Sequence, residues 1–474
     1  MKKVLSIIFV LILLAPTVTW LARLDFGIHV ERIGLKPPRF DSRALLKNDY
    51  YLSFDQYLND SFSLRDPLIF SKRWLDYHLF KMTDTAAVHV GRQGWLYSRN
   101  SINDFRKQAC DDLLLIQQLA LDLHAVDHLL SASGRRFVFM VAPNKSTIYP
   151  EYIGFIPTGG LCGRSRYDLL LETFARYPLK NFVRLENRLF YSKRSNRWLY
   201  NPTGTHWNAL GAAVAAEAIA EQIDQKSGHW ALDAPHKVSG DPIDLVRRLL
   251  GLSTPVEDEV NIEKTSAAPP ESLDAVIYGD GYLENLIPYL SQIMGRIEVV
   301  ETDAIPSRRN GENWLTTEMI LLETAESHLG TLRIDVDKIY TILATDALLP
   351  LSYPIDLESF VPESSISLNN RAEGLEIKSV GDPSRFAIMS IPGSDDQIFR
   401  LLKLIVEAPH SDTMTLKFKT DSPLITHKAL RPGFTTLYLP LPFQKELSLS
   451  IRPGSKAGVL MLKSAEILTF AALR

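Results

Sequence analysis

The sequence predicts a doubly wound α/β domain followed by an antiparallel β-sandwich, with a transmembrane helix at the N-terminus. Three observations lead to this prediction. Short apolar strands alternate with helices over residues 75–330, the order that builds a parallel sheet covered on both faces. Period-two segments separated by turn residues dominate residues 345–474, a pattern typical of a sandwich. An uncharged stretch fills most of residues 1–23.

Length and charge limit the classes of function. The chain has 474 residues, too many for one compact core and enough for about two to four domains. Hydrophobic residues make up 46% of the sequence and charged residues 23%, which is ordinary for a globular protein. Because the formal net charge is −3 and the basic residues are scattered, we exclude nucleic acid as a partner.

The first 23 residues have the pattern of a signal anchor. Lys2 and Lys3 precede the uncharged segment Val4–Ala22, which is long enough to cross a hydrocarbon core of about 30 Å. The bulky residues Val18–Leu21 make a poor site for signal cleavage. We therefore expect a single-pass inner-membrane protein with its bulk in the periplasm. Residues 24–74 are predicted to be a linker and a first helix.

The α/β region is predicted element by element. Apolar residues recur at helical spacing over Leu113–Leu130, and Arg136–Ala142 is a short apolar run typical of a buried parallel strand. Further helices are expected at Tyr167–Arg176, Ala209–Ile223 and Leu283–Met294, and further strands at Phe182–Leu185, Ala275–Tyr278, Arg296–Val300 and Glu318–Leu322.

The C-terminal region alternates apolar and polar residues between turns such as Asp382-Pro383 and Pro392-Gly393. Each alternating segment is predicted to be a strand of the sandwich. The expected strands are Leu375–Val380, Phe386–Ile391, Leu401–Val406, Thr413–Thr420, Thr435–Leu439, Leu447–Ile451 and Val459–Leu462.

The two cysteines, Cys110 and Cys162, lie far from any C-x-x-C pair. One disulfide formed in an oxidising compartment and two unrelated buried thiols are both open interpretations. His124 and His128 have the i, i+4 spacing of metal ligands on a helix, but no third ligand is evident. We predict no metal and no cofactor.

Two strand-to-helix corners carry the chemistry. Tyr200–Ala212 (YNPTGTHWNALGA) leads into a helix, and Val276–Tyr282 (VIYGDGY) leaves a strand at a Gly-Asp-Gly turn. Open α/β sheets hold ligands at the carboxyl ends of their strands. A corner of this kind aims one side chain at a ligand and presents backbone N–H groups to an anion.

These corners resemble the AlgJ/AlgX group of alginate O-acetyltransferases, whose catalytic domain is of the SGNH-hydrolase type. The family carries Asp-Thr-His-Trp in the first corner and Gly-Asp-Ser in the second. The resemblance implies that the Asp orients the His, the His deprotonates the Ser, and the Ser carries an acetyl group to a polysaccharide hydroxyl. It extends over about residues 45–330, and the other similar segments are 59–65, 90–97, 142–151 and 320–326.

The sequence departs from the family at two essential positions. His206 and Trp207 are retained, but Gly204 stands where the family has Asp and Gly281 where it has the Ser nucleophile. Without these side chains no intact catalytic set remains, and only binding and oxyanion effects are left.

Residues around the two glycines are the candidate ligand contacts. They are His206, Trp207, Asp280, Tyr282 and Lys145. Asp280 has a carboxylate, but we expect its side chain to leave the backbone in a different direction from a side chain at position 281. Two structural alternatives stay open: His206 as a hydrogen-bonded histidine packed by Trp207, and Lys145 as a surface lysine paired with Glu151.

In layout, the C-terminal region is similar to the carbohydrate-binding modules of AlgX-type proteins. All seven Trp lie before it, the last being Trp314, so it offers no tryptophan platform for a sugar. We interpret it as a structural or protein-contact module, with sugar binding as the alternative.

We therefore predict a catalytically degenerate, membrane-anchored protein of exopolysaccharide assembly, export or modification. Its expected partners are a saccharide or polysaccharide ligand, proteins of that machinery, and the inner membrane. The alternative is an active O-acetyltransferase or acetyl-esterase with a non-standard nucleophile.

Overall fold

The structure is a computed structural model. Beyond isolated residues near the N-terminus, it describes residues 48–61, 64–83, 87–156, 162–193, 198–223, 273–301, 304–306, 314–344, 350–363, 366–379, 386–392, 398–419, 424–444, 446–454 and 459–470. The expected anchor Val4–Ala22 and the linker after it lie largely outside the described residues. Their topology therefore stays a prediction.

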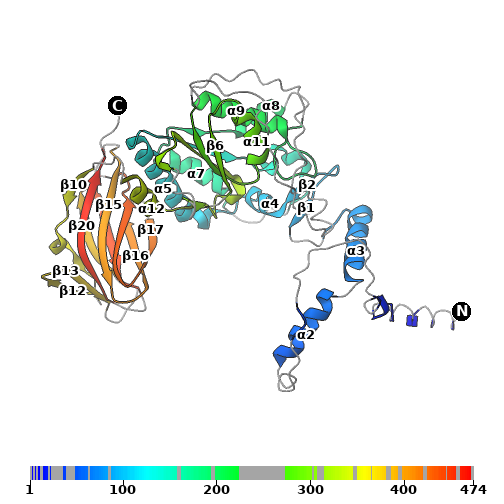
Figure 1. Ribbon diagram of the computed structural model, residues 1–474, viewed down its shortest axis with the longest axis horizontal. Helices are drawn as coiled ribbons and strands as arrows, with labels where there is room; N and C mark the ends of the chain where they lie inside the picture. The colour runs from blue at the N-terminus through cyan, green and yellow to red at the C-terminus, as the bar shows by residue number, and fades with distance from the viewer. Residues whose placement is uncertain are drawn as a thin grey trace.

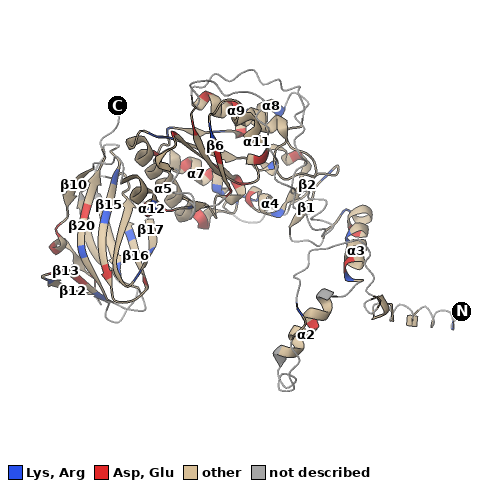
Figure 2. Ribbon diagram, viewed as in Figure 1, with Lys and Arg blue, Asp and Glu red and all other residues tan. Residues whose placement is uncertain are grey.

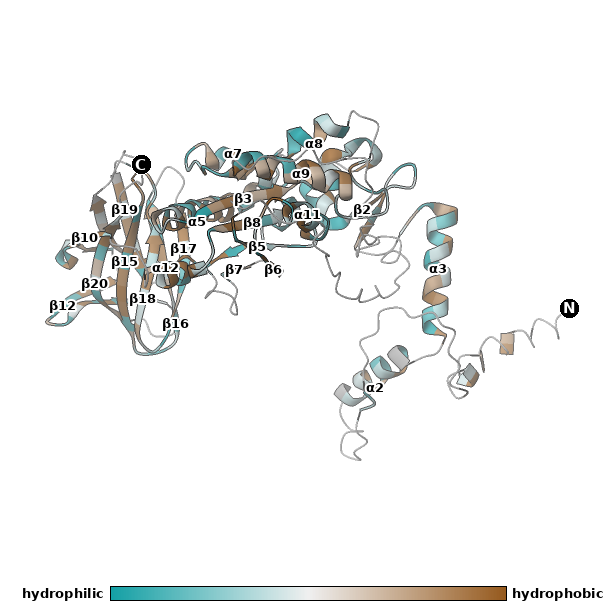
Figure 3. Cartoon of the chain, turned by 45° about the horizontal axis from the view of Figure 1, so that its top comes forward, coloured by the Kyte–Doolittle hydropathy of each residue, from teal (hydrophilic) through white to brown (hydrophobic). Residues whose placement is uncertain are grey.

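A parallel five-stranded sheet forms the centre of the α/β region, with the strand order β4-β3-β8-β5-β6. The buried strands β3 and β8 lie side by side over their whole lengths, from the Arg136–Met319 pair to the Ala142–Ala325 pair. Figure 3 shows these central strands as hydrophobic. The strands are β3 Arg136–Ala142, β4 Phe182–Val183, β5 Ala275–Gly279, β6 Ile297–Glu301 and β8 Met319–Ala325.

Helices cover both faces of this sheet (Figure 1). On β3, Val138 and Met140 belong to one buried cluster, and Phe137 and Phe139 belong to another, because successive side chains of a strand point to opposite faces. The first cluster includes α9 Ala209–Gln222 and α11 Leu283–Leu290, and the second includes α5 Leu113–Ala132, α7 Arg166–Phe174 and α12 Val336–Ala344. The doubly wound α/β prediction is confirmed for the described residues.

Smaller elements border the sheet. They are β1 Val88–Val90, β2 Leu96–Ser98, α4 Arg99–Phe105, α6 Lys145–Ile148, α8 Glu186–Ser192, β7 Ala304–Ile305 and β9 Arg333–Ile334. The predicted bounds of β3 are those of the structure. The helix expected at Leu283–Met294 ends earlier, at Leu290. Pro288 lies inside this helix.

Two antiparallel sheets form the C-terminal region, one in the order β12-β13-β20-β15-β18 with β10 beside β20, the other β11-β14-β19-β16-β17. Their inner faces share one buried cluster. The strands are β10 Leu351–Pro354, β11 Val361–Pro362, β12 Ile366–Arg371, β13 Gly374–Ser379, β14 Ala387–Pro392, β15 Arg400–Ala408, β16 Asp412–Lys419, β17 Leu424–Leu430, β18 Gly433–Pro440, β19 Glu446–Arg452 and β20 Val459–Thr469. The predicted sandwich is confirmed. Strands β10, β11, β12 and β17 were missed because they lie at or near sheet edges and bury few side chains.

Charged residues of both signs lie on the outer face of the larger sheet (Figure 2). Lys403 contacts Glu466 at 3.2 Å on the neighbouring strand. Lys463 contacts Glu407 at 2.8 Å. Such half-buried cross-strand pairs add little stability each.

The sandwich packs directly against the α/β region. Lys428 of β17 forms an ion pair with Asp337 of α12 at 2.6 Å, and the rings of Tyr438 and Tyr340 lie 4.2 Å apart. Phe399 and Leu468 belong to the same buried cluster as the helices of the second face. The two regions therefore share a hydrophobic core.

Two N-terminal helices, α2 Asn48–Ser61 and α3 Arg65–Phe80, lie away from the sheet (Figure 1). Among the described residues, Cys110–Ala132 is the one helical segment long and apolar enough to span a membrane, and most of it is buried inside the protein. It contains α5 and serves as a core helix of the α/β region.

Candidate functional site at the carboxyl edge of the sheet

The candidate site lies at the carboxyl ends of the central strands. Strand β5 ends at Gly279, and Asp280 and Gly281 form the turn into α11. The segment before α9 approaches this turn. Asn208 caps α9 by accepting hydrogen bonds from the N–H groups of Leu210 and Gly211, at 3.0 and 3.2 Å.

The His206 ring lies directly against Gly281. A β-carbon at Gly281 would be 2.5 Å from Cε1 of His206 and 3.1 Å from Nε2, closer than atoms in van der Waals contact. The two motifs therefore meet as the resemblance implies. However, the imidazole fills the volume that a side chain at position 281 would need.

Trp207 and Tyr282 are buried, with exposed fractions of 1% and 2%. The indole Nε1–H of Trp207 donates to the carbonyl of Tyr282 at 2.9 Å, and Asn285 donates to the carbonyl of Trp207 at 2.9 Å. These aromatic residues join the first corner to α11. We expected both residues to contact a ligand, and the structure instead places them in the core.

Lys145 is also buried, with an exposed fraction of 2%. Its ammonium donates to the carbonyls of Asn201 and Pro202 at 3.2 and 3.0 Å, and also to the carbonyl of Gly204. An ammonium has three protons, and three carbonyls accept them here. Lys145 thus holds the first corner from within the protein, and its side chain is buried rather than presented at the surface. The alternative pairing with Glu151 does not occur either.

Glu151 instead pairs with Lys193, at 2.7 Å. Gly204 is buried, and its N–H donates to the carbonyl of Asn201 at 3.2 Å. The backbone of Gly204 thus takes part in the loop that Lys145 fixes, and the residue supplies no carboxylate to the neighbouring His206.

Asp280 is held by His328, which our sequence analysis did not single out. Nδ1 of His328 lies 2.8 Å from Oδ2 of Asp280. The N–H groups of Ala325 and Tyr282 also donate to Asp280, each at 3.1 Å. Burial opposes ionisation of Asp280, but these hydrogen bonds, with that from His328 the largest of them, hold its pKa below the usual range. The sequence feature that could have pointed to His328 is its place three residues after the end of β8, at the carboxyl edge of the sheet.

Residues 88–247 match the family model of the SGNH hydrolase-like domain of the acetyltransferase AlgX. This part of the α/β region is therefore similar to the SGNH hydrolase-like domain of AlgX. A probable alginate O-acetylase AlgJ of Pseudomonas fluorescens is 25% identical over 229 residues, which are 48% of this chain and 53% of that protein. The chain thus spans about half the length of that relative.

Two solved structures are also similar. The O-acetyltransferase domain of Pseudomonas putida AlgJ is 18% identical, with a TM-score of 0.37, over 55% of this chain and 99% of that one. Pseudomonas aeruginosa AlgX is 13% identical, with a TM-score of 0.36, over 81% of this chain and 94% of that one.

Two buried glutamates lie at this edge of the α/β domain. Glu323 of β8 is 1% exposed, and its Oε2 accepts the N–H of Asp280 at 3.0 Å, while its Oε1 has no hydrogen-bond partner among the described residues. Burial raises the pKa of Glu323 well above the usual range, and the charge of Asp280 adds to this effect. Burial also raises the pKa of Glu326 to about 7. Of the three carboxyl groups, Asp280 is therefore the one most fully ionised at neutral pH.

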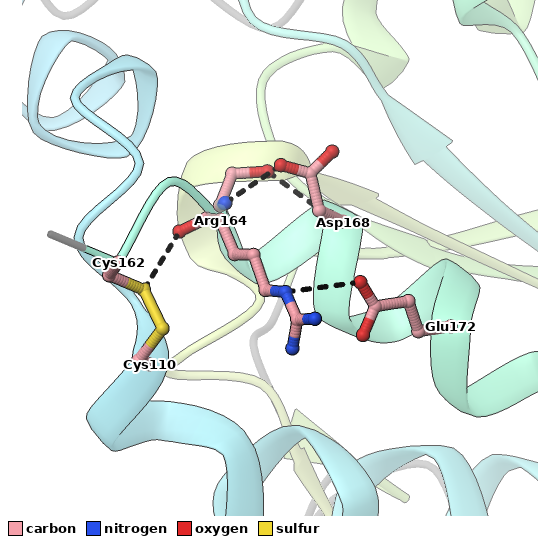
Figure 4. The surroundings of a disulfide bond; sticks show 6 residues. Cys110, Cys162, Arg164, Asp168 and Glu172 are labelled. Atoms are coloured by element: carbon pink, nitrogen blue, oxygen red, sulfur yellow. Dashed lines mark hydrogen bonds and ion pairs between the residues drawn. A yellow bond between two sulfur atoms is a disulfide. The ribbon is translucent and has the colours of Figure 1, made fainter.

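The two cysteines of the domain form a disulfide, with Cα atoms 5.8 Å apart (Figure 4). It joins the start of α5 to the segment before α7. Arg164 beside it pairs with Glu172 at 3.3 Å. The disulfide interpretation is confirmed and the alternative of two free thiols is wrong.

His124 and His128 pack against aromatic rings of the sandwich side. The His124 ring is 5.0 Å from that of Phe443, and the His128 ring stacks at 5.0 Å on Phe399. Among the described residues, no group of three or more His, Cys, Asp or Glu could hold a metal ion. Burial lowers the pKa of His124 to about 4, so this imidazole is a neutral core residue.

Proposed function

We propose that this protein acts in the modification of an exported polysaccharide by binding glycan or a partner protein, without forming an acyl-enzyme on a serine. The observation that carries the proposal is the contact between His206 and Gly281. Where the resembling family has a serine, this chain has an imidazole ring within 2.5 Å of the β-carbon position. The similar AlgJ proteins are named as probable alginate O-acetylases, which supports a polysaccharide as the ligand class.

Asp280 does not replace the missing nucleophile. Its carboxylate accepts hydrogen bonds from His328 and from the N–H groups of Ala325 and Tyr282. A carboxylate bonded in this way is stabilised in the ground state and is a poor nucleophile. An active O-acetyltransferase or acetyl-esterase with another nucleophile remains the second candidate, favoured by the retained His206.

An acetyl-ester turnover assay tests the proposal. We expect the full chain to hydrolyse 4-nitrophenyl acetate no faster than its His206→Ala variant, because no serine is available for His206 to activate. A Gly281→Ser, Gly204→Asp variant measures whether the family's residues restore transfer. A His206-dependent rate in the wild-type chain would contradict the proposal.

Ligand binding is tested by titration. We expect a weak saccharide affinity, about millimolar or about −4 kcal/mol, because Trp207, Tyr282 and Lys145 are buried and few groups converge on a ligand. Calorimetry with uronate and neutral oligosaccharides, beside the His206→Ala variant, measures it. If no sugar binds, or if the variant binds equally well, the domain is better explained as a scaffold for partner proteins.

We also propose that Val4–Ala22 stays uncleaved and anchors the chain in the inner membrane with its bulk in the periplasm. The disulfide supports an oxidising compartment. Fractionation and N-terminal sequencing test this topology. A mature N-terminus beyond residue 20 and free solubility in the periplasm would refute the anchor and leave only export.

A further inference from the structure

Helix α3 carries an exposed apolar stripe. Leu68, Leu75 and Leu79 are seven and four residues apart, which places them on one side of a helix with 3.6 residues per turn, and Met82 follows just beyond the end of α3. Their exposed fractions are 59%, 44%, 65% and 65%. Helix α3 stands apart from the central sheet and from the sandwich (Figure 1, Figure 3). Because contiguous apolar side chains on a surface mark a contact site, this apolar stripe needs a partner.

The opposite side of α3 is the covered one. Asp66 is fully buried and pairs with Arg65 at 3.0 Å. Phe70 and Tyr77 lie on the same side of the helix as Asp66 and are half-buried. This side is about half a turn around the helix from the three leucines. A helix at the surface of a soluble protein turns its polar side outward, whereas α3 turns its apolar stripe outward and buries a carboxylate.

Positive charge borders the apolar stripe. Residues 64–83 contain four Lys or Arg and two Asp, a formal net charge of +2, whereas the whole chain carries −3. Lys72 lies on the side of the leucines and is 60% exposed, although it pairs with Asp76 at 2.7 Å, and a long Lys side chain extends from an apolar surface to a charged one. Trp74 is 42% exposed, and its ring stacks on that of His78 at 4.3 Å. An apolar stripe bordered by basic and aromatic residues is typical of a helix that lies on an anionic bilayer.

We propose that α3 lies along the surface of a bilayer of anionic phospholipids, with its apolar stripe among the acyl chains and its basic side chains at the headgroups. The inference deepens the membrane topology proposed above and rests on that anchor only for the nearness of the bilayer, since residues 23–64 separate α3 from Val4–Ala22. Helix α3 is followed by β1 at Val88, so its contact holds the α/β domain close to the membrane. The net positive charge disfavours pairing of α3 with a second copy of itself and favours an anionic surface.

A fluorescent label on the full chain in vesicles of phosphatidylcholine and phosphatidylglycerol tests this contact. The label is attached to a Leu79→Cys variant, while the native cysteines stay in their disulfide. Leu351→Cys is the matched control, because Leu351 of β10 is a leucine of the sandwich with the same exposed fraction of 65%. Lipids with a nitroxide in the upper acyl chain should quench the label at position 79 by about half or more, since an interfacial helix sinks its apolar side about 5–10 Å into the boundary between headgroups and acyl chains. The label at position 351 should lose less than about a tenth of its fluorescence, and replacing phosphatidylglycerol by phosphatidylcholine should weaken the quenching at position 79.

Carbonate extraction of the same vesicles reports on the anchor separately. A chain that is retained after extraction but shows no quenching at position 79 overturns the inference and leaves the proposed anchor standing. A chain that carbonate removes, although lipid quenches its label at position 79, refutes the anchor and supports the inference. Equal quenching at positions 79 and 351 would overturn the inference. Crosslinking of two chains through position 79 without quenching by lipid would also overturn it, in favour of a second copy of the chain.

Discussion

Gly281→Ala measures directly how the His206 ring fills the nucleophile position. The new β-carbon would lie 2.5 Å from Cε1 of His206, about 1 Å inside normal carbon–carbon contact. The ring must therefore move, and it is 7% exposed with Tyr282 packed against it at 4.6 Å. Overpacking of this kind costs about 1–3 kcal/mol. We expect Gly281→Ala to lower the free energy of unfolding by that amount.

A double-mutant cycle with His206→Ala isolates the contact. Removing the imidazole frees the space, so Gly281→Ala should cost less than about 0.5 kcal/mol in the His206→Ala background. Gly211→Ala is the matched control, because its β-carbon would meet the carbonyl of Leu199 at 2.6 Å and no change at His206 relieves that clash. Urea unfolding gives all the values. An equal cost of Gly281→Ala in both backgrounds would refute the steric explanation.

Three further predictions concern stability. Lys145→Met leaves three carbonyls, that of the buried Gly204 among them, without their donor, and should lower the free energy of unfolding by about 3 kcal/mol or more. Lys193→Met, at the half-buried pair with Glu151, should cost under about 1 kcal/mol. A similar cost for both variants in urea unfolding would contradict the anchoring role of Lys145. Replacing both Cys110 and Cys162 by Ala opens a loop that the disulfide closes over a sequence separation of 52, so the free energy of unfolding measured by calorimetry should fall by about 2–4 kcal/mol. Dithiothreitol should cause the same loss in the wild type and no loss in the double variant. Burial lowers the pKa of His124 from its usual value of 6.5 to about 4, so between these pH values the unfolded chain binds a proton that the folded chain does not, and the free energy of unfolding falls as the pH falls. From pH 7 to pH 5 the wild type should lose about 2 kcal/mol more than His124→Phe in urea unfolding. Parallel pH curves for the two proteins would rule this out.

Regular periodicity made most of the fold predictable. The apolar run Arg136–Ala142 has the bounds of β3, because a strand buried on both faces must be apolar at every position. The strands of the sandwich that fill its core were also predicted. Strand β17 was not, because it alternates weakly and lies at an edge, where few side chains need to be apolar.

The sequence by itself determined which residues make the two corners, and that positions 204 and 281 have no side chains for nucleophilic chemistry. Only the tertiary structure decided where charges and rings lie. It buries Lys145 beneath the first corner, brings His206 against Gly281, and pairs Asp280 with His328, which is 48 residues away along the chain. Such partners come from different strands and loops that meet at one sheet edge. Their distances depend on packing across the sheet, and no local pattern of residues encodes them.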